Sequence, residues 1–123
     1  MRKVVLATLS VDQLVQQFTN VTLAQDKALL EDDFTEFNRL FAEMESIKGE
    51  LKSRDGDQRR TLVRLYDHPN AQVRLKAVKA TLAIEPVVAR QALQAIADSN
   101  EFPQAGEAGM SLINLDRGIF KPS

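Results

Sequence analysis

His68 is the only imidazole in the chain, so it is the first candidate for general acid–base chemistry. A general base must lie within about 3 Å of the group whose proton it takes. Asp67 is next to it in the sequence, but adjacency in the sequence does not establish that geometry. His68 also precedes Pro69, and the residue before a proline is disfavoured in helical geometry. We therefore interpret His68 as a turn residue and predict no catalytic residue.

A run of carboxylates suggests a second kind of chemistry, the binding of a divalent cation. Glu31, Asp32 and Asp33 are followed by Glu36. Calcium loops alternate their oxygen ligands and have a central glycine, and this run has neither feature. Acidic residues at the start of a helix cap its unpaired N–H groups and favour the positive end of its dipole. Capping therefore explains the run without a metal. One histidine and no cysteine also exclude the usual zinc sites, so we predict no metal and no cofactor.

The basic side chains are concentrated in the middle of the chain. Residues 1–53 carry six basic and nine acidic side chains (net −3), residues 54–90 carry eight and four (net +4), and residues 91–123 carry two and four (net −2). A basic block can bind phosphate when several of its side chains converge on one face. The whole chain has a net charge of −1, so nucleic acid is the alternative partner and not the expected one. The candidate phosphate-binding residues are Arg59, Arg60, Arg64, Lys76 and Lys79.

The acidic side chains of the first third of the chain are candidates for binding a protein. A cluster of carboxylates can steer a basic partner and complement its charge. The alternative is that these residues are the solvated faces of two amphipathic helices. The candidate partner-binding residues are Asp26, Glu31, Asp32, Asp33, Glu36 and Glu43.

Length and composition are typical of one helical domain spanning residues 1–123. The hydrophobic content of 44% supports a modest core, and five glycines leave little room for a phosphate-binding loop. The apolar run of residues 4–9 is shorter than the roughly 7–15 residues of a signal peptide. No stretch approaches the roughly 18 apolar residues that cross a bilayer. We therefore predict a cytoplasmic protein that does not bind a membrane.

Two long helices are expected first, forming an antiparallel hairpin over residues 10–53. Ser10 and Gln13 have the spacing of a capping box, followed by a helix to about Glu31 with apolar residues every three or four positions. Asp32 or Asp33 can cap the second helix, whose apolar stripe runs to Leu51.

Four shorter helices are expected after the turn at residues 53–57. Asp57 can cap a helix over residues 58–66, and Asn70 can cap another over residues 71–84. Pro86 suits the first turn of a helix over residues 87–97. The last expected helix covers residues 104–115, so the predicted class is all-α.

The region from residue 57 to residue 120 resembles HEAT-type helical repeats. Two short helices flank Asp67-His68-Pro69-Asn70, and the second continues with Val73-Arg74, Ala77 and Ala80. In such repeats the small alanines let helices approach closely, and the resemblance implies that Arg74 binds loop carbonyls or a neighbouring acidic residue. The predicted architecture is therefore a helical hairpin followed by a HEAT-like α–α superhelix.

The order of segments is also similar to a small bacterial family of uncharacterised, HEAT-like helical proteins. The similar stretches begin at Leu9-Ser10-Val11 and include Phe37-Asn38-Arg39, residues 67–82, and the segment from Phe102-Pro103 through Ile119-Phe120. No catalytic residues are assigned in that family, and some members look like immunity partners of secreted polymorphic toxins. The resemblance therefore implies a protein that binds and occludes a cognate toxin. Two other hypotheses stay open, a HEAT-like nucleic-acid-binding protein and a scaffold module that self-associates.

Overall fold

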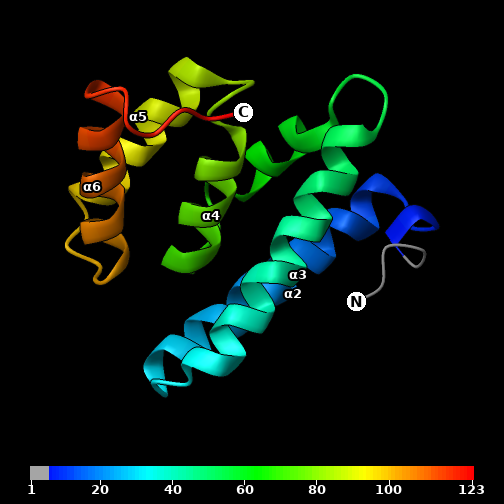
Figure 1. Ribbon diagram of the computed structural model, residues 1–123, viewed down its shortest axis with the longest axis horizontal. Helices are drawn as coiled ribbons and strands as arrows, with labels where there is room; N and C mark the ends of the chain where they lie inside the picture. Colours follow the sequence, from blue (N-terminus) through cyan, green and yellow to red (C-terminus); the bar gives the residue numbers. More distant parts are fainter. Residues whose placement is uncertain (1–5) are drawn as a thin grey trace. The chain divides into compact units, whose positions relative to one another are not determined.

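The structure, a computed structural model, describes residues 6–123 and is all-helical over that range, with no strand (Figure 1). It divides into two compact units, Met1–Thr61 and Leu62–Ser123. We call them unit 1 and unit 2. None of the helices described here is both long enough and apolar enough to cross a membrane.

Helix α2 (Val11–Leu30) begins at the predicted capping box. The Ser10 hydroxyl accepts a hydrogen bond from the Gln13 amide at 3.1 Å, and the Gln13 side chain accepts one from the Ser10 amide at 2.8 Å. The helix buries one face, which includes the polar residues Thr19, Thr22 and Gln25, and the two threonines donate their hydroxyl protons to the carbonyls of the preceding turn. These bonds satisfy hydroxyls that would otherwise be costly to bury.

Helix α3 (Phe34–Ser53) returns alongside α2, so the two form the predicted antiparallel hairpin (Figure 1). Asp33 is its N-cap, because its carboxylate accepts a hydrogen bond from the Glu36 amide at 3.1 Å. Asp32 has a positive φ of 53° and makes the turn between the helices. The hairpin buries Leu14 and Phe18 from α2, with Leu40, Met44, Ile47 and Leu51 from α3.

The helix expected over residues 58–66 is a 3₁₀-helix, η1 (Gln58–Leu65), and Asp57 does not cap an α-helix. Asp57 has a positive φ of 52°, whereas an N-cap residue normally has extended geometry. Its carboxylate binds the backbone amide and the guanidinium of Arg59. The prediction of an α-helix here was wrong because the segment is a 3₁₀-helix, although the Asp57 carboxylate does accept a hydrogen bond from the Arg59 amide near its start.

Unit 2 contains three α-helices, close to the expected bounds. Helix α4 (Ala71–Thr81) starts after Asn70, whose side-chain oxygen accepts hydrogen bonds from the amides of Gln72 and Val73, and ends three residues before the predicted end. Helix α5 (Pro86–Ala97) has Pro86 in its first turn. Helix α6 (Gln104–Asp116) follows.

The core of unit 2 lies between α4, α5 and α6, which pack against one another. Small side chains at Ala89 and Ala108 let the helices approach closely, and both are fully buried. Tyr66 and Phe120 pack on the edge of this cluster. The other buried members of the cluster are Leu75, Val78, Leu82, Leu93, Ile96 and Leu112.

Candidate functional site

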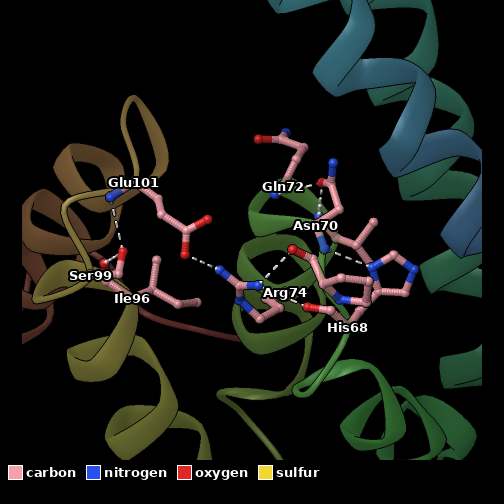
Figure 2. Close-up of polar contacts among 9 residues, drawn as sticks. His68, Asn70, Gln72, Arg74, Ile96, Ser99 and Glu101 are labelled. Atoms are coloured by element: carbon pink, nitrogen blue, oxygen red, sulfur yellow. Dashed lines mark hydrogen bonds and ion pairs between the residues drawn. The ribbon is translucent and has the colours of Figure 1, made fainter.

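The turn before α4 uses its histidine to hold the backbone. The Nδ1 atom of His68 accepts a hydrogen bond from the Asn70 amide at 3.0 Å. The backbone carbonyl of His68 accepts a second hydrogen bond, from the guanidinium of Arg74 at 2.8 Å (Figure 2). His68 therefore has the contacts of a turn residue. The hydrogen bond of its ring joins it to a backbone amide and not to a carboxylate.

Arg74 connects three segments of unit 2. Besides the His68 carbonyl, its guanidinium binds the Pro69 carbonyl at 3.1 Å and the carboxylate of Glu101 at 2.5 Å. Glu101 lies in the loop between α5 and α6, where its amide binds the Ser99 hydroxyl (Figure 2). The ion pair therefore joins the start of α4 to the loop between α5 and α6.

A groove of about 470 Å³ lies between α4 and α5 and is partly open to solvent. We call it the α4–α5 groove. Its polar end is formed by Tyr66, Asp67 and Arg74. The pKa of Tyr66 is raised, chiefly by burial and also by the charge of Glu85, although its hydrogen bond with Thr81 opposes both. Tyr66 therefore lines the groove as a neutral phenol. The apolar walls are Val78, Val88, Ala92, Ala95 and Ile96.

In unit 1, the predicted acidic residues gather where α2 turns into α3. We call residues 30–36 the elbow. Glu31 ends α2 and lies 3.8 Å from the amine of Lys27, while Asp32 and Asp33 make the turn and are exposed. Asp26 lies one turn earlier and is half-buried.

Arg39 partly neutralises the acidic side of α3. Its guanidinium lies 2.5 Å from the Glu36 carboxylate and 2.7 Å from that of Glu43. The hydrogen bond with Arg39 holds the pKa of Glu36 below its ordinary value. Of the six predicted partner-binding residues, Glu36 and Glu43 are thus committed to a local ion-pair network.

Two large apolar side chains are exposed at the elbow. Leu30 is 80% exposed and Phe34 is 63% exposed. They flank the turn that carries Glu31, Asp32 and Asp33, so apolar and acidic side chains share this surface. Position 34 fits the apolar spacing of the second expected helix as well as a buried residue does, so the sequence gives no sign that Phe34 is exposed.

The basic candidates are mostly held by carboxylates. Arg59 is 4% exposed and pairs with Asp57 at 2.7 Å, and its hydrogen bonds hold the pKa of Asp57 below the ordinary value. Lys76 and Lys79 both bind Glu107, at 2.9 Å and 3.1 Å. Arg60 and Arg64 are exposed. Arg59 and Arg60 belong to unit 1, and the other three candidates belong to unit 2.

Glu107 forms the centre of a polar contact between α4 and α6. Burial raises its pKa, but the charges and hydrogen bonds of Lys76 and Lys79 outweigh burial and leave the pKa below its ordinary value. One turn earlier, Gln104 donates a hydrogen bond to Gln72 at 2.9 Å, and both amides are buried. The two lysines thus serve packing inside unit 2. In residues 6–123, no three metal-ligating side chains form a group that could hold an ion.

Comparison with known proteins assigns the chain to a family. A family model described as a domain of unknown function (DUF2019) matches residues 12–116. The chain belongs to the DUF2019 family. No curated protein matches it.

A solved structure is similar to this DUF2019 protein over almost the whole chain. It is the crystal structure of the protein RPA1889 from Rhodopseudomonas palustris, which is 53% identical in sequence. The TM-score is 0.93, and the similarity covers 96% of this chain and 98% of that one. The DUF2019 match includes the elbow and the α4–α5 groove.

Proposed function

We propose that this DUF2019 protein is a non-enzymatic protein-binding module that contacts its partner through the elbow. The observation that carries the proposal is the exposure of Leu30 and Phe34 beside three carboxylates. Single exposed apolar residues are ordinary in soluble proteins. Protein interfaces, however, combine apolar and aromatic side chains at their centre with a polar rim, and the elbow has both parts.

The partner that complements this surface has an apolar recess edged by Lys or Arg. Carboxylates at the rim of an interface accelerate association with a basic partner and select against acidic ones. A basic toxin domain has this charge, and toxin binding is the role that the resemblance to immunity proteins implies. Neutralisation would then result from steric occlusion of the toxin.

We also propose that residues 62–116 of unit 2, from the second half of η1 to the end of α6, form two HEAT-like helix pairs. Arg74 supports this arrangement because it binds the loop carbonyls of His68 and Pro69 and the carboxylate of Glu101. The fully buried Ala77 and Ala108 also fit the close helix approach of such repeats. Here the first helix of the first pair is a 3₁₀-helix, which departs from the repeat.

Substitution of the apolar residues tests the elbow directly. The affinity-tagged protein is used to isolate its partner, and the double variant Leu30→Ser with Phe34→Ser is compared with wild type. Loss of two central apolar anchors is expected to weaken binding at least tenfold. The matched control is Val87→Ser with Ile119→Ser, which removes two similarly exposed apolar side chains from unit 2. Equal binding by both double variants would contradict the proposal.

Charge removal tests the acidic part of the elbow. Glu31→Gln with Asp32→Asn removes two charges and keeps Asp33, which caps α3, and asparagine tolerates the positive φ of residue 32. We expect slower association and a weaker dependence on salt. Asp55→Asn with Asp98→Asn removes two exposed charges elsewhere and serves as the control. An unchanged association rate for the elbow variant argues against electrostatic steering.

A growth assay tests whether the partner is a toxin. The product of a neighbouring gene is expressed alone, with the wild-type protein, or with the Leu30→Ser, Phe34→Ser variant. The proposal predicts growth arrest that the wild type relieves and the variant does not. If the neighbouring products are harmless, the toxin assignment is wrong, while the binding experiments still decide whether the elbow is an interface.

A further inference from the structure

The α4–α5 groove of unit 2 has a shape and a charge that the elbow does not explain. We propose that it binds a short, extended segment of a partner protein that carries apolar side chains and one Lys or Arg. This site lies wholly in unit 2 and is independent of the elbow in unit 1.

The length of the groove favours an extended peptide. On α5, Val88, Ala92, Ala95 and Ile96 recur at helical spacing and present one apolar face to the groove. At about 1.5 Å per residue, the stretch from Val88 to Ile96 is about 12 Å long. An extended chain covers that length with about four residues, at roughly 3.3 Å each.

The open side of the groove argues against a small metabolite. Small-molecule sites usually bury at least 70–90% of their ligand's surface. This groove is partly open to solvent, so a ligand bound in it would keep part of its surface exposed. A bound peptide would keep one side in solvent and bury alternate side chains against Val88 and Ala92 of the α5 wall.

The charge of the groove selects a cation. Asp67 is exposed at the polar end, and within residues 6–123 no basic side chain forms an ion pair with it. Arg74 is the basic residue of the lining, but Glu101 already neutralises it. The groove therefore presents one uncompensated negative charge, which complements Lys or Arg in a peptide.

The two walls are tied together before any peptide binds. The ion pair between Arg74 and Glu101 links the start of α4 to the loop after α5, next to Ile96 and Ser99 (Figure 2). The Ser99 hydroxyl donates to the Ile96 carbonyl at 2.7 Å, which fixes the end of the α5 wall. A preformed groove reduces the ordering cost that binding must offset.

Selection from a peptide library tests the proposal with the intact protein. A library of seven-residue linear peptides displayed on phage is selected against the wild type, and an enriched sequence is synthesised with a fluorescent label. We expect enriched sequences to combine Lys or Arg with apolar residues at alternate positions. Val88→Trp should fill the groove and weaken binding of the labelled peptide at least tenfold. Its control, Val87→Trp, changes an exposed neighbour that does not line the groove and should leave binding unchanged.

A second pair of variants tests the charge. Asp67→Asn should weaken binding of the peptide about fivefold, roughly the effect of one exposed ion pair. It should also abolish the preference for Lys over Glu at the same peptide position. Asp98→Asn is the control, because Asp98 is exposed at the end of α5 outside the groove. The Leu30→Ser, Phe34→Ser variant should bind the peptide normally, so failure of the elbow proposal and failure of this one are distinguishable.

Several results would overturn the proposal. Absence of any enriched peptide would exclude a peptide site, as would equal binding to Val88→Trp and Val87→Trp. Binding of hexylamine in the groove without peptide enrichment would assign it to small amphiphilic amines. Equal binding of Lys and Glu peptides to the wild type would overturn the role of Asp67.

Discussion

At the scale of single residues, Arg74 shows why a guanidinium is needed where several segments meet. Its planar group donates simultaneously to the carbonyls of His68 and Pro69 and to the carboxylate of Glu101. A lysine amine is a compact point charge and does not reproduce this fork of donors. Arg74 therefore holds the turn before α4 and the loop between α5 and α6 in position.

Replacing Arg74 by lysine should destabilise the protein although the charge is kept. We expect Arg74→Lys to lower the free energy of unfolding by about 1–2 kcal/mol, because at least one carbonyl loses its charged donor. Urea denaturation followed by circular dichroism measures the change. Arg60→Lys alters an exposed arginine and should have almost no effect. Equal stability of Arg74→Lys and wild type would show that the bridge contributes little.

Glu107 should make stability depend on acid pH. Its pKa in the folded protein is below its ordinary value of 4.5, so its contribution is present above that value. That contribution is lost as the pH falls through the folded pKa, because the folded state must then take up the proton as well. The Glu107 carboxyl is 40% exposed, so its two ion pairs are worth only about 1 kcal/mol at neutral pH.

The variant Glu107→Gln isolates this contribution. We expect it to be less stable than wild type by about 1 kcal/mol at pH 7, and we expect this difference to shrink as the pH falls below 4.5. Chemical denaturation at a series of pH values measures the difference. A difference that stays constant from pH 7 to pH 3 would mean that lost packing and not lost charge is responsible.

At the scale of elements, helix starts could be predicted because capping is a local property. Ser10 with Gln13, Asp33 and Asn70 all cap the helices expected of them. Asp57 accepts a hydrogen bond from the Arg59 amide at the start of η1, but that helix is a 3₁₀-helix and not the expected α-helix, and no local pattern in the sequence shows this difference. Helix α4 ends at Thr81, where the Glu85 amide binds the Thr81 carbonyl before Pro86 starts the next helix.

The candidate sites depend on contacts between elements that are distant in the sequence, and these contacts limited how much of the sites could be predicted. The α4–α5 groove joins Asp67 to residues of α5 more than twenty positions later, and nothing in the local pattern indicates that proximity. The same holds for Lys76 and Lys79, which look like a basic surface in the sequence but share Glu107 of α6. The elbow was partly predictable because its carboxylates are consecutive. Its exposed Leu30 and Phe34 were not.

Helix α4 should depend measurably on its cap. The Asn70 oxygen accepts from the amides of Gln72 and Val73, at 2.9 Å and 3.2 Å. Asn70→Ala leaves both amides without this acceptor and should cost about 1 kcal/mol of unfolding free energy, measured by thermal or urea denaturation. Asn70→Asp keeps an acceptor and should recover most of the loss. If aspartate and alanine are equally destabilising, the cap is not the cause.

At the scale of the whole molecule, the distribution of charge bears on the class of partner. The chain carries 16 basic and 17 acidic side chains, and its central block is basic. Much of that block is used internally, since Arg59 pairs with Asp57 and the two lysines of α4 pair with Glu107. Nucleic-acid affinity depends on the number of basic groups that reach phosphates. Pairing inside the protein reduces the number of basic groups in this block that can do so.

The protein should therefore leave the mobility of nucleic acid unchanged. In a gel-shift assay with labelled DNA and RNA at about 150 mM salt, we expect no complex at micromolar protein, because nonspecific binding needs several phosphate contacts that these paired side chains do not supply. Arg60→Glu with Arg64→Glu provides the comparison, since both residues are exposed. A salt-sensitive shift that this double variant abolishes would favour the nucleic-acid-binding hypothesis. Binding through the elbow would then have to be tested in the presence of that nucleic acid.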